Sequence, residues 1–141
     1  MKTLILTVGL PRSGKSTWAK ETGLPIVNPD SVRLALHGER FVAKSEPMIW
    51  TITAYMVQAL FLAGHDQIVL DATNITKERR ARFKSKDWTR LYKLMTATEH
   101  ECLLRCDLLN DEYIKPVIRD MAAAFEPIQQ SELCDGDAIL S

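Results

Sequence analysis

Residues 4–16 read LILTVGLPRSGKS, an apolar run followed at once by a complete G-x-x-x-x-G-K-S/T loop. An apolar run before such a loop is typical of a buried strand. Glycines let the backbone turn so that successive N–H groups face a phosphate, while Lys15 adds a charge and Ser16 a hydroxyl ligand for Mg²⁺. The pattern predicts a nucleoside triphosphate site, with these residues in contact with the nucleotide: Gly9, Pro11, Arg12, Ser13, Gly14, Lys15, Ser16 and Thr17.

Outward from this loop, strand-like apolar runs alternate with helical patterns. Such alternation predicts a three-layer α/β/α fold with a central parallel sheet of about five strands. Ligands of such sheets lie beyond the carboxyl ends of the strands. The expected strands are 2–8, 24–27, 67–70, 90–96 and 138–140, and the expected helices are 15–22, 31–36, 46–63, 77–85, 99–109 and 113–125.

A charged pair, Asp30 and Arg33, follows the second expected strand. Pro29 forces an extended conformation on the preceding residue, so the strand ends there and Asp30 stands at the start of the next helix. The three-residue spacing puts both side chains on one helical face. A phosphoryl transferase needs such a pair, because a carboxylate accepts the proton of the attacking hydroxyl and a guanidinium holds a substrate phosphate. The alternative is a helix-capping aspartate with a local ion pair.

The third expected strand ends in Asp71, followed by Thr73 and Asn74. A carboxylate after an apolar strand commonly helps to hold the magnesium of a phosphate loop, so Asp71 joins Ser16 as a candidate metal-binding residue. The alternative is that Asp71, Thr73 or Asn74 caps the following helix.

The 141-residue chain has ordinary globular composition, with 46% hydrophobic and 26% charged residues. Its length suits a single domain over residues 1–141. Cys102, Cys106 and Cys134 make an odd count, and Lys2 leads directly into the first strand with no signal peptide, so we expect reduced thiols and a cytoplasmic protein. Cys102 and Cys106 lack partners at zinc-site spacing, which favours ordinary thiols.

The net charge is zero, but residues 76–93 carry eight basic and two acidic side chains. This basic segment either attracts a polyanion or is a solvated helix face with charges on all sides, since no aromatic stacking platform interleaves with it. Residues 47–63 contain no charge and approach the length of a membrane span, yet capping signals on both sides favour a buried helix. We therefore expect no membrane association.

Taken together, these motifs resemble the phage-type polynucleotide 5′-hydroxyl kinases and the wider clade of small phosphate-loop kinases. The resemblance rests on residues 9–19, on Asn28-x-Asp30-x-x-Arg33, and on Asp71-x-Thr73-Asn74 followed by residues 78–80. It implies that Asp30 is the general base toward the 5′-hydroxyl and that Arg33 contacts the substrate phosphate. It further implies that Lys15 and Ser16 bind ATP and Mg²⁺, and that Thr73, Asn74 and Arg79 contribute to substrate binding.

One departure from the family pattern concerns its short helical lid. Members typically carry two lid arginines four residues apart, and here Arg105 is followed by Leu109. Another cation must then neutralise the transition-state charge, because one arginine can contribute about 10³ to 10⁵ in rate. Our hypothesis is that Arg12 or Arg105 fills that catalytic role.

The sequence therefore predicts an ATP-dependent kinase acting on the 5′-hydroxyl end of DNA or RNA. Two alternatives stay open: a kinase of a small hydroxylated metabolite, nucleoside or nucleotide sugar, and a nucleotide-dependent binding module. The oligomeric state, the preferred nucleotide donor and the choice between DNA and RNA are also left open.

Overall fold

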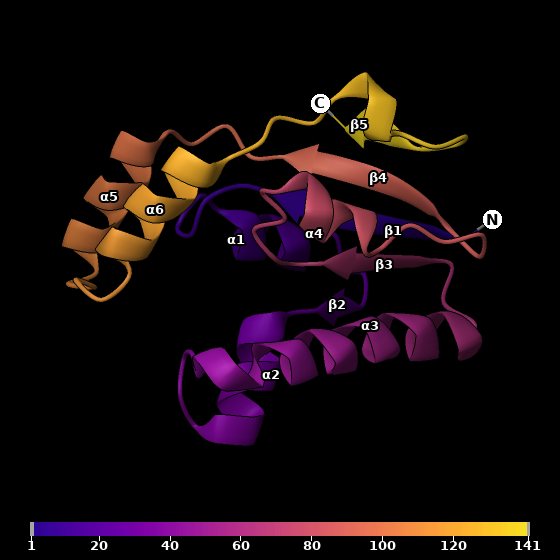
Figure 1. Ribbon diagram of the computed structural model, residues 1–141, viewed down its shortest axis with the longest axis horizontal. Helices are drawn as coiled ribbons and strands as arrows, with labels where there is room; N and C mark the ends of the chain where they lie inside the picture. Colours follow the sequence, from indigo (N-terminus) through magenta and orange to yellow (C-terminus); the bar gives the residue numbers. More distant parts are fainter. Residues whose placement is uncertain (1, 141) are drawn as a thin grey trace.

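A computed structural model describes residues 2–140, which fold around a five-stranded parallel sheet (Figure 1). The strands are β1 (Thr3–Val8), β2 (Ile26–Val27), β3 (Gln67–Leu70), β4 (Thr89–Leu94) and β5 (Ala138–Leu140). They lie in the order β2-β3-β1-β4-β5, so the strand that leads into the glycine-rich loop is central. Leu6 of β1 lies opposite Leu70 of β3, and Val8 of β1 opposite Leu94 of β4. The loops that follow these three strands therefore leave from one edge of the sheet.

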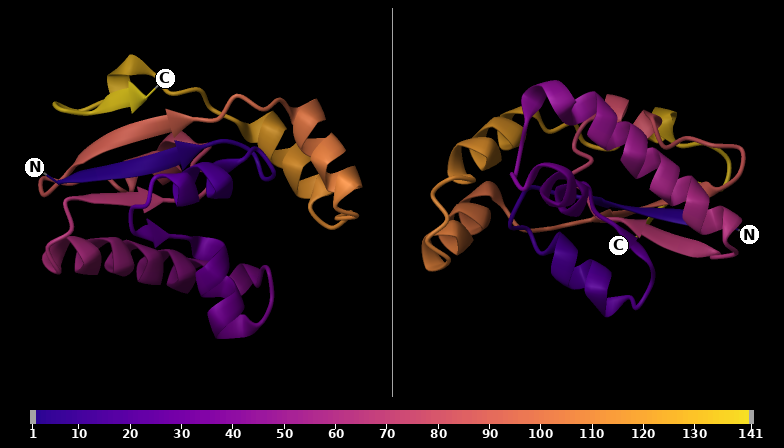
Figure 2. Two further views of the ribbon diagram at one scale, coloured as in Figure 1. Left: turned by 180° about the vertical axis from the view of Figure 1, so that it is seen from behind. Right: turned by 90° about the horizontal axis from the view of Figure 1, so that it is seen from below.

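Helices cover both faces of the sheet, which confirms the predicted three-layer α/β/α fold (Figure 2). They are α1 (Lys15–Glu21), α2 (Pro29–His37), α3 (Glu46–Leu62), α4 (Lys77–Ala81), α5 (Glu99–Leu108) and α6 (Lys115–Ala124), with short 3₁₀ turns at Ala43–Ser45 and Gln130–Glu132. On one face, Phe61 of α3 packs on the apolar side of β1 and β3. On the other, Ala19 of α1 packs against Ile5 and Val69.

Helices α5 and α6 form a hairpin beyond the carboxyl ends of β1 and β4 (Figure 1). A separate small core joins them, in which Cys102, Cys106 and Ile118 pack around Leu10 of the glycine-rich loop. The thiols of both cysteines are free and buried. This hairpin occupies the position expected for the helical lid.

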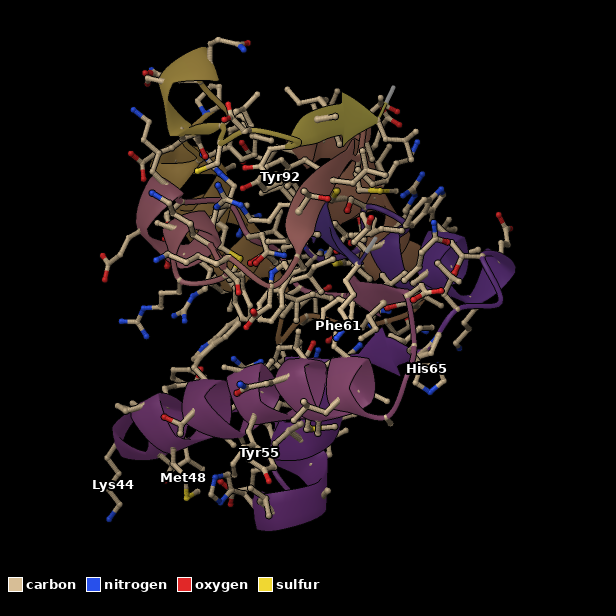
Figure 3. The ribbon with its side chains drawn as sticks, turned by 90° about the vertical axis from the view of Figure 1, so that its right-hand side faces the viewer. Lys44, Met48, Tyr55, Phe61, His65 and Tyr92 are labelled. Carbon is tan, nitrogen blue, oxygen red and sulfur yellow. The ribbon has the colours of Figure 1, made fainter. Side chains whose placement is uncertain are left out.

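Helix α3 is buried on one side only, so the predicted buried helix is only half correct. Its inner positions are Ile49, Thr53, Val57 and Phe61, whereas Met48 and Tyr55 project from the opposite side into solvent (Figure 3). Within residues 2–140, no helix combines the length and the hydropathy that crossing a bilayer requires.

Two buried arginines fasten the C-terminal segment to the sheet. Arg80 is fully buried and donates to both carboxylate oxygens of Glu132, at 2.7 and 3.1 Å, and to the carbonyls of Asn74 and Glu126. Arg90 forms an ion pair of 2.8 Å with Asp137. The guanidinium of Arg90 also donates to the Arg80 carbonyl, at 2.9 Å. Because Arg80 belongs to the core, the expectation of a fully solvated basic helix at 76–86 is wrong there.

The predicted helix boundary next to Arg80 is also incorrect. The sequence predicts a helix over 77–85, but α4 ends at Ala81 and continues only as single turns. Arg90 approaches from β4 and takes a carbonyl at the helix end. No local pattern in 77–85 announces this contact.

Candidate active site

The glycine-rich loop closes tightly around the carboxyl end of β1. A Cβ on Gly9 would lie 2.8 Å from both Met95 Cβ and Ser13 Oγ, so only glycine fits there. Gly14 caps α1 with φ of 97°, a backbone conformation that favours glycine. Both fixed glycines of the motif are therefore required by the shape of the loop.

Lys15 is buried at the base of this loop, and its Nζ donates to the Leu10 carbonyl at 2.7 Å. Burial lowers the pKa of Lys15, and the carboxylates of Asp71 and Asp30 partly offset that shift. The charges of both candidate carboxylates therefore act on the pKa of Lys15, although the two residues follow different strands.

Asp71 and Ser16, the two candidate metal-binding residues, are in contact. Ser16 Oγ donates to Asp71 Oδ2 at 2.7 Å, and Asn28 Nδ2 donates to the same oxygen at 3.0 Å. A hydroxyl beside a buried carboxylate is a hard oxygen donor set, which fits Mg²⁺. Ser16 and Asp71 are the residues that could hold the metal.

Neither Asp30 nor Asp71 caps a helix through its side chain. Asn28 caps α2 and accepts from the backbone N–H groups of Asp30 and Ser31, at 2.8 and 3.2 Å. Thr76 caps α4 and accepts from the N–H of Arg79. The capping alternatives are therefore wrong for both carboxylates.

Thr73 and Asn74 contact the end of β1 and the start of the loop, Thr73 through its backbone carbonyl and Asn74 through its side-chain amide. The N–H of Gly9 donates to the Thr73 carbonyl at 3.0 Å. Asn74 is fully buried with φ of 46°, and its Nδ2 donates to the Thr7 carbonyl at 2.8 Å. This geometry gives the Asn74 amide nitrogen a structural role, while its buried Oδ1 has no hydrogen-bond partner within residues 2–140.

Asp30 and Arg33 do form a pair, and a second carboxylate completes it. Arg33 Nη1 donates to Asp30 Oδ1 at 2.6 Å, while its Nε and Nη2 donate to Glu46 at 2.9 and 2.6 Å. Burial acts to lower the pKa of Arg33, but Glu46 and Asp30 outweigh it and the pKa is raised. The Asp30 side chain is 78% exposed, so its second oxygen is open to a hydroxyl group. Sequence reasoning missed Glu46 as a partner.

Arg79 lies on an aromatic ring supplied by α3. Its Cζ is 3.6 Å from the centroid of Trp50, and Arg33 lies 5.9 Å from the same ring. Burial lowers the pKa of Arg79, with the positive charge of Arg82 adding to the shift. Among residues 2–140 no carboxylate forms an ion pair with Arg79, and its buried Nη1 lacks a hydrogen-bond partner. An aromatic ring that stacks on an arginine of the basic segment thus comes from α3.

Arg12 and Arg105 lie at the mouth of the loop. Arg105 Nη1, from α5, donates to the Arg12 carbonyl at 2.8 Å. Arg12 has φ of 67° and reaches Asp111 in the turn after α5, with 2.6 Å between Nη2 and Oδ2. Leu109, at the position of the expected lid arginine, is exposed. The loop, Trp18, Glu21 and the lid residues Arg105, Leu108 and Leu109 line a hollow of about 670 Å³, a volume typical of small-molecule sites.

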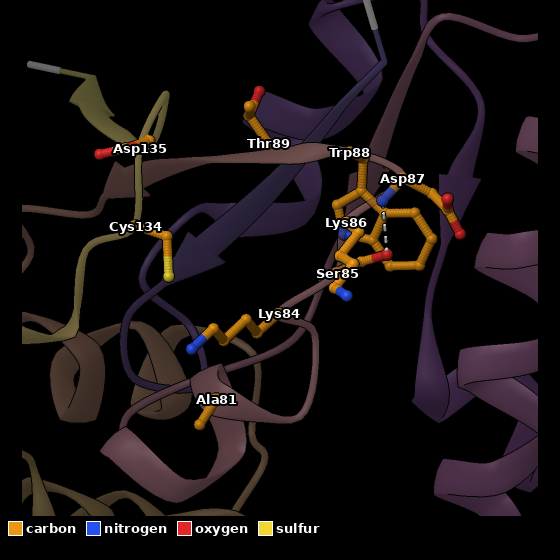
Figure 4. Close-up of a pocket in the computed structure, with 9 residues that line it drawn as sticks. All are labelled: Ala81, Lys84, Ser85, Lys86, Asp87, Trp88, Thr89, Cys134 and Asp135. Carbon is orange, nitrogen blue, oxygen red and sulfur yellow. Dashed lines mark hydrogen bonds between the residues drawn. The ribbon is translucent and has the colours of Figure 1, made fainter.

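A larger hollow, of about 840 Å³, lies at the other end of the sheet (Figure 4). Its residues precede β4 and β5, among them Lys84, Lys86, Trp88 and Cys134. The amino ends of parallel strands seldom carry the active site. The hollow at the glycine-rich loop therefore stays the candidate site.

Comparisons with known proteins agree with this geometry. Residues 4–103 match the AAA_33 family, described as an AAA domain. A chain of the Pnkp1/Rnl/Hen1 complex is 26% identical, with a TM-score of 0.66 over 74% of this chain and 39% of that one, so the present chain spans about two fifths of that protein.

Two more distant structures share the fold over nearly the whole chain. The APS kinase CysC of Mycobacterium tuberculosis is 18% identical, with a TM-score of 0.58 over 99% of this chain and 87% of that one. The shikimate kinase of Acinetobacter baumannii is 13% identical, with a TM-score of 0.57 over 100% of this chain and 84% of that one. With a matching family segment, a parallel sheet and a complete phosphate loop, the chain belongs to the AAA_33 family and has the fold of a P-loop kinase.

Proposed function

We propose that this protein is a Mg²⁺-assisted kinase that transfers the γ-phosphate of ATP to the 5′-hydroxyl of DNA or RNA. One observation carries the proposal: Ser16 of the glycine-rich loop contacts Asp71 at 2.7 Å, and the exposed carboxylate of Asp30 pairs with Arg33 at 2.6 Å. A kinase needs both a metal-binding pair for the nucleotide and a carboxylate and cation for the acceptor.

On the donor side, Gly9 and Ser13 already donate their N–H groups to backbone carbonyls, so the remaining N–H groups of the loop hold the phosphates, and Lys15 reaches their outer oxygens. Ser16 and Asp71 would hold Mg²⁺, since both supply hard oxygen atoms and these already lie 2.7 Å apart. Bound there, Mg²⁺ would supply positive charge that offsets the negative charge of the phosphates. Asn28 donates to Asp71 and keeps the carboxylate turned toward Ser16.

On the acceptor side, the exposed oxygen of Asp30 takes the proton of the 5′-hydroxyl. Arg33 is held by Glu46 through two nitrogens, which orients the guanidinium toward the acceptor. Its remaining N–H groups bind the nearest phosphate of the polynucleotide. Arg79 lies beside Arg33 on Trp50 and adds a second cation for the same strand.

A small hydroxylated metabolite is a second candidate acceptor, favoured by the charge balance around Arg33. Two carboxylates contact that one guanidinium, so its net attraction for a phosphate is weakened. The chain as a whole also has zero net charge. The likeness to a chain of the Pnkp1/Rnl/Hen1 complex, together with the order of the sequence motifs, supports the polynucleotide instead.

The test is transfer of labelled γ-phosphate from ATP to 5′-hydroxyl oligonucleotides, assayed beside nucleosides, sugars and other hydroxylated metabolites. We expect labelled oligonucleotide and a loss of about 10²-fold or more in turnover with Asp30→Ala. Asp87→Ala, an exposed carboxylate at the other end of the sheet, is the matched control and should keep full activity. Label on a metabolite alone would favour the second candidate, and undiminished activity of Asp30→Ala would remove the assigned base.

Salt dependence separates the two acceptors further. Binding of a polynucleotide releases counterions, so its KM should rise steeply with salt concentration. A metabolite with one or no phosphate should show only a shallow dependence.

A further inference from the structure

Two arginines from distant parts of the chain converge on one carboxylate at the mouth of the candidate site. Arg12 Nη2 donates to Asp111 Oδ2 at 2.6 Å, and Arg40 Nη1 and Nη2 donate to Oδ1 and Oδ2 at 3.1 and 3.2 Å. Arg12 belongs to the glycine-rich loop, Arg40 to the loop after α2, and Asp111 to the turn between α5 and α6. We call Arg12 and Arg40 the mouth pair.

Contacts other than Asp111 also hold the mouth pair. The Arg12 carbonyl accepts from Arg105 at 2.8 Å, which fixes its backbone in the left-handed region. The Arg40 guanidinium lies 4.5 Å from the ring centroid of Tyr113. Both arginines would therefore stay near one another if Asp111 withdrew.

The mouth pair joins two parts of the candidate site. Arg12 belongs to the glycine-rich loop, and Arg40 follows α2, the helix that carries Asp30. Hydrogen bonding to Asp111 is the main cause of a raised pKa at Arg40, and the charge of Asp30 contributes to the same shift. Asp111 therefore connects the loop of the donor side to the segment that follows the acceptor helix.

Solvent reaches the two arginines more easily than the carboxylate between them. The side chains of Arg12 and Arg40 are 37% and 45% exposed, against 11% for Asp111. Ion pairs this exposed contribute little to stability, so their partner can be exchanged. A phosphate carries more negative charge than a carboxylate and offers three oxygens to the two guanidinium forks.

We propose that the mouth pair is a phosphate-binding site, that Asp111 occupies it as an internal anion, and that a substrate phosphate displaces Asp111. The inference deepens the proposed kinase function and rests on it for the identity of the substrate. Arg40 belongs to no motif of the sequence analysis. In this proposal its positive charge partly replaces that of the lid arginine expected at the position of Leu109. The ligand is a phosphate group, either the γ-phosphate of ATP or a phosphate of the acceptor.

The test is calorimetric titration of the full chain with ATP, ADP and a 5′-hydroxyl oligonucleotide. We expect Arg40→Ala to raise the dissociation constant of one phosphate ligand about tenfold. Asp111→Asn should lower the dissociation constant of the same ligand about threefold or more. Lys86→Ala, an exposed cation at the amino ends of the strands, is the matched control and should bind like the natural protein. A merely structural role of the cluster would not make Asp111→Asn a tighter binder.

The ligands distinguish the two sources of phosphate. If Arg40→Ala binds ATP more weakly but ADP as before, the mouth pair contacts the γ-phosphate. If only binding of the oligonucleotide is weaker, the mouth pair contacts a phosphate of the acceptor. Equal weakening of ATP and ADP, no change in any ligand, or weaker binding by Asp111→Asn would each overturn the inference. Failure of the natural protein to phosphorylate any oligonucleotide would contradict the proposed function, yet the ATP and ADP titrations would still decide the role of the mouth pair.

Discussion

Arg80 and Arg90 differ from the mouth pair, Arg12 and Arg40, in what their charge can do. Arg80 and Arg90 are buried, and carboxylates and backbone carbonyls of the C-terminal segment accept their hydrogen bonds. Arg12 and Arg40 are partly exposed and share one carboxylate. A buried arginine with a full set of partners can only stabilise the fold, whereas an exposed one that shares its partner can exchange it for a ligand.

The strongest test of this contrast removes Arg80. Arg80→Met leaves Glu132 and two backbone carbonyls without their buried donor, so we expect the free energy of unfolding to fall by about 3 to 5 kcal/mol. Urea unfolding measures the loss. Arg82→Met is the matched control two residues away, where an exposed pair of 3.5 Å with Glu78 should be worth under about 0.5 kcal/mol. Equal losses of unfolding free energy in both variants would show that burial does not decide how much these arginines contribute to stability.

A smaller effect is expected on the acceptor side, at Arg33. Arg33→Lys cannot donate to Glu46 through two nitrogens and to Asp30 through a third, because an ammonium is a single point of charge. We predict a rise of about tenfold in the acceptor KM, roughly 1.4 kcal/mol, with the nucleotide KM unchanged. Steady-state kinetics with each substrate varied in turn measures both constants. A change confined to the nucleotide KM would move Arg33 out of the acceptor site.

Asn28 offers a third test, because it joins the capping of α2 to the orientation of Asp71. Asn28→Ala removes the cap and should cost about 1 kcal/mol in unfolding free energy. Asn28→Ser keeps a capping oxygen but loses the amide that donates to Asp71, so it should fold normally and bind Mg²⁺ more weakly. Urea unfolding and Mg²⁺ titration of the nucleotide-bound enzyme separate the two roles. Loss of Mg²⁺ affinity in neither variant would show that Asn28 acts only as a cap.

The sequence reveals those parts of the site that depend on local spacing. The glycine-rich loop, the strand before it and the carboxylate after β3 are all read from adjacent residues, and parallel strands then bring Ser16 and Asp71 together. Asn28 could also have been identified as the cap, because Pro29 is favoured at the first helical position and so leaves Asn28 just before it. Asn and Asp are both favoured at the N-cap, so residue type alone does not distinguish Asn28, the observed cap, from Asp30, the alternative considered above.

Side-chain partners that come from distant segments could not be predicted in this way. Arg79 and Arg80 are neighbours in one basic run, yet one lies on Trp50 and the other is buried on Glu132. The partner of each arginine depends on which side of the five-residue helix α4 faces the sheet. Arg40 and Asp111 lie 71 residues apart and meet only because the lid returns toward α2.

The smallest effect concerns the pH dependence of the Asp111 contact. Hydrogen bonds from Arg40 and Arg12 lower the pKa of Asp111 from 3.8 to about 2 in the folded protein. Because the folded pKa is the lower one, this contact stabilises the protein fully above about pH 4 and loses its effect as the pH falls toward 2. Asp111→Asn should therefore lower stability by less than about 1 kcal/mol at neutral pH, since both arginines are partly exposed and solvent screens their charge. The difference from the natural protein should shrink steadily below about pH 4, as thermal unfolding over a pH series would measure. A difference that stayed constant to the lowest pH at which the protein folds would mean that Asp111 acts through packing, and its exchange for a phosphate would lose its electrostatic basis.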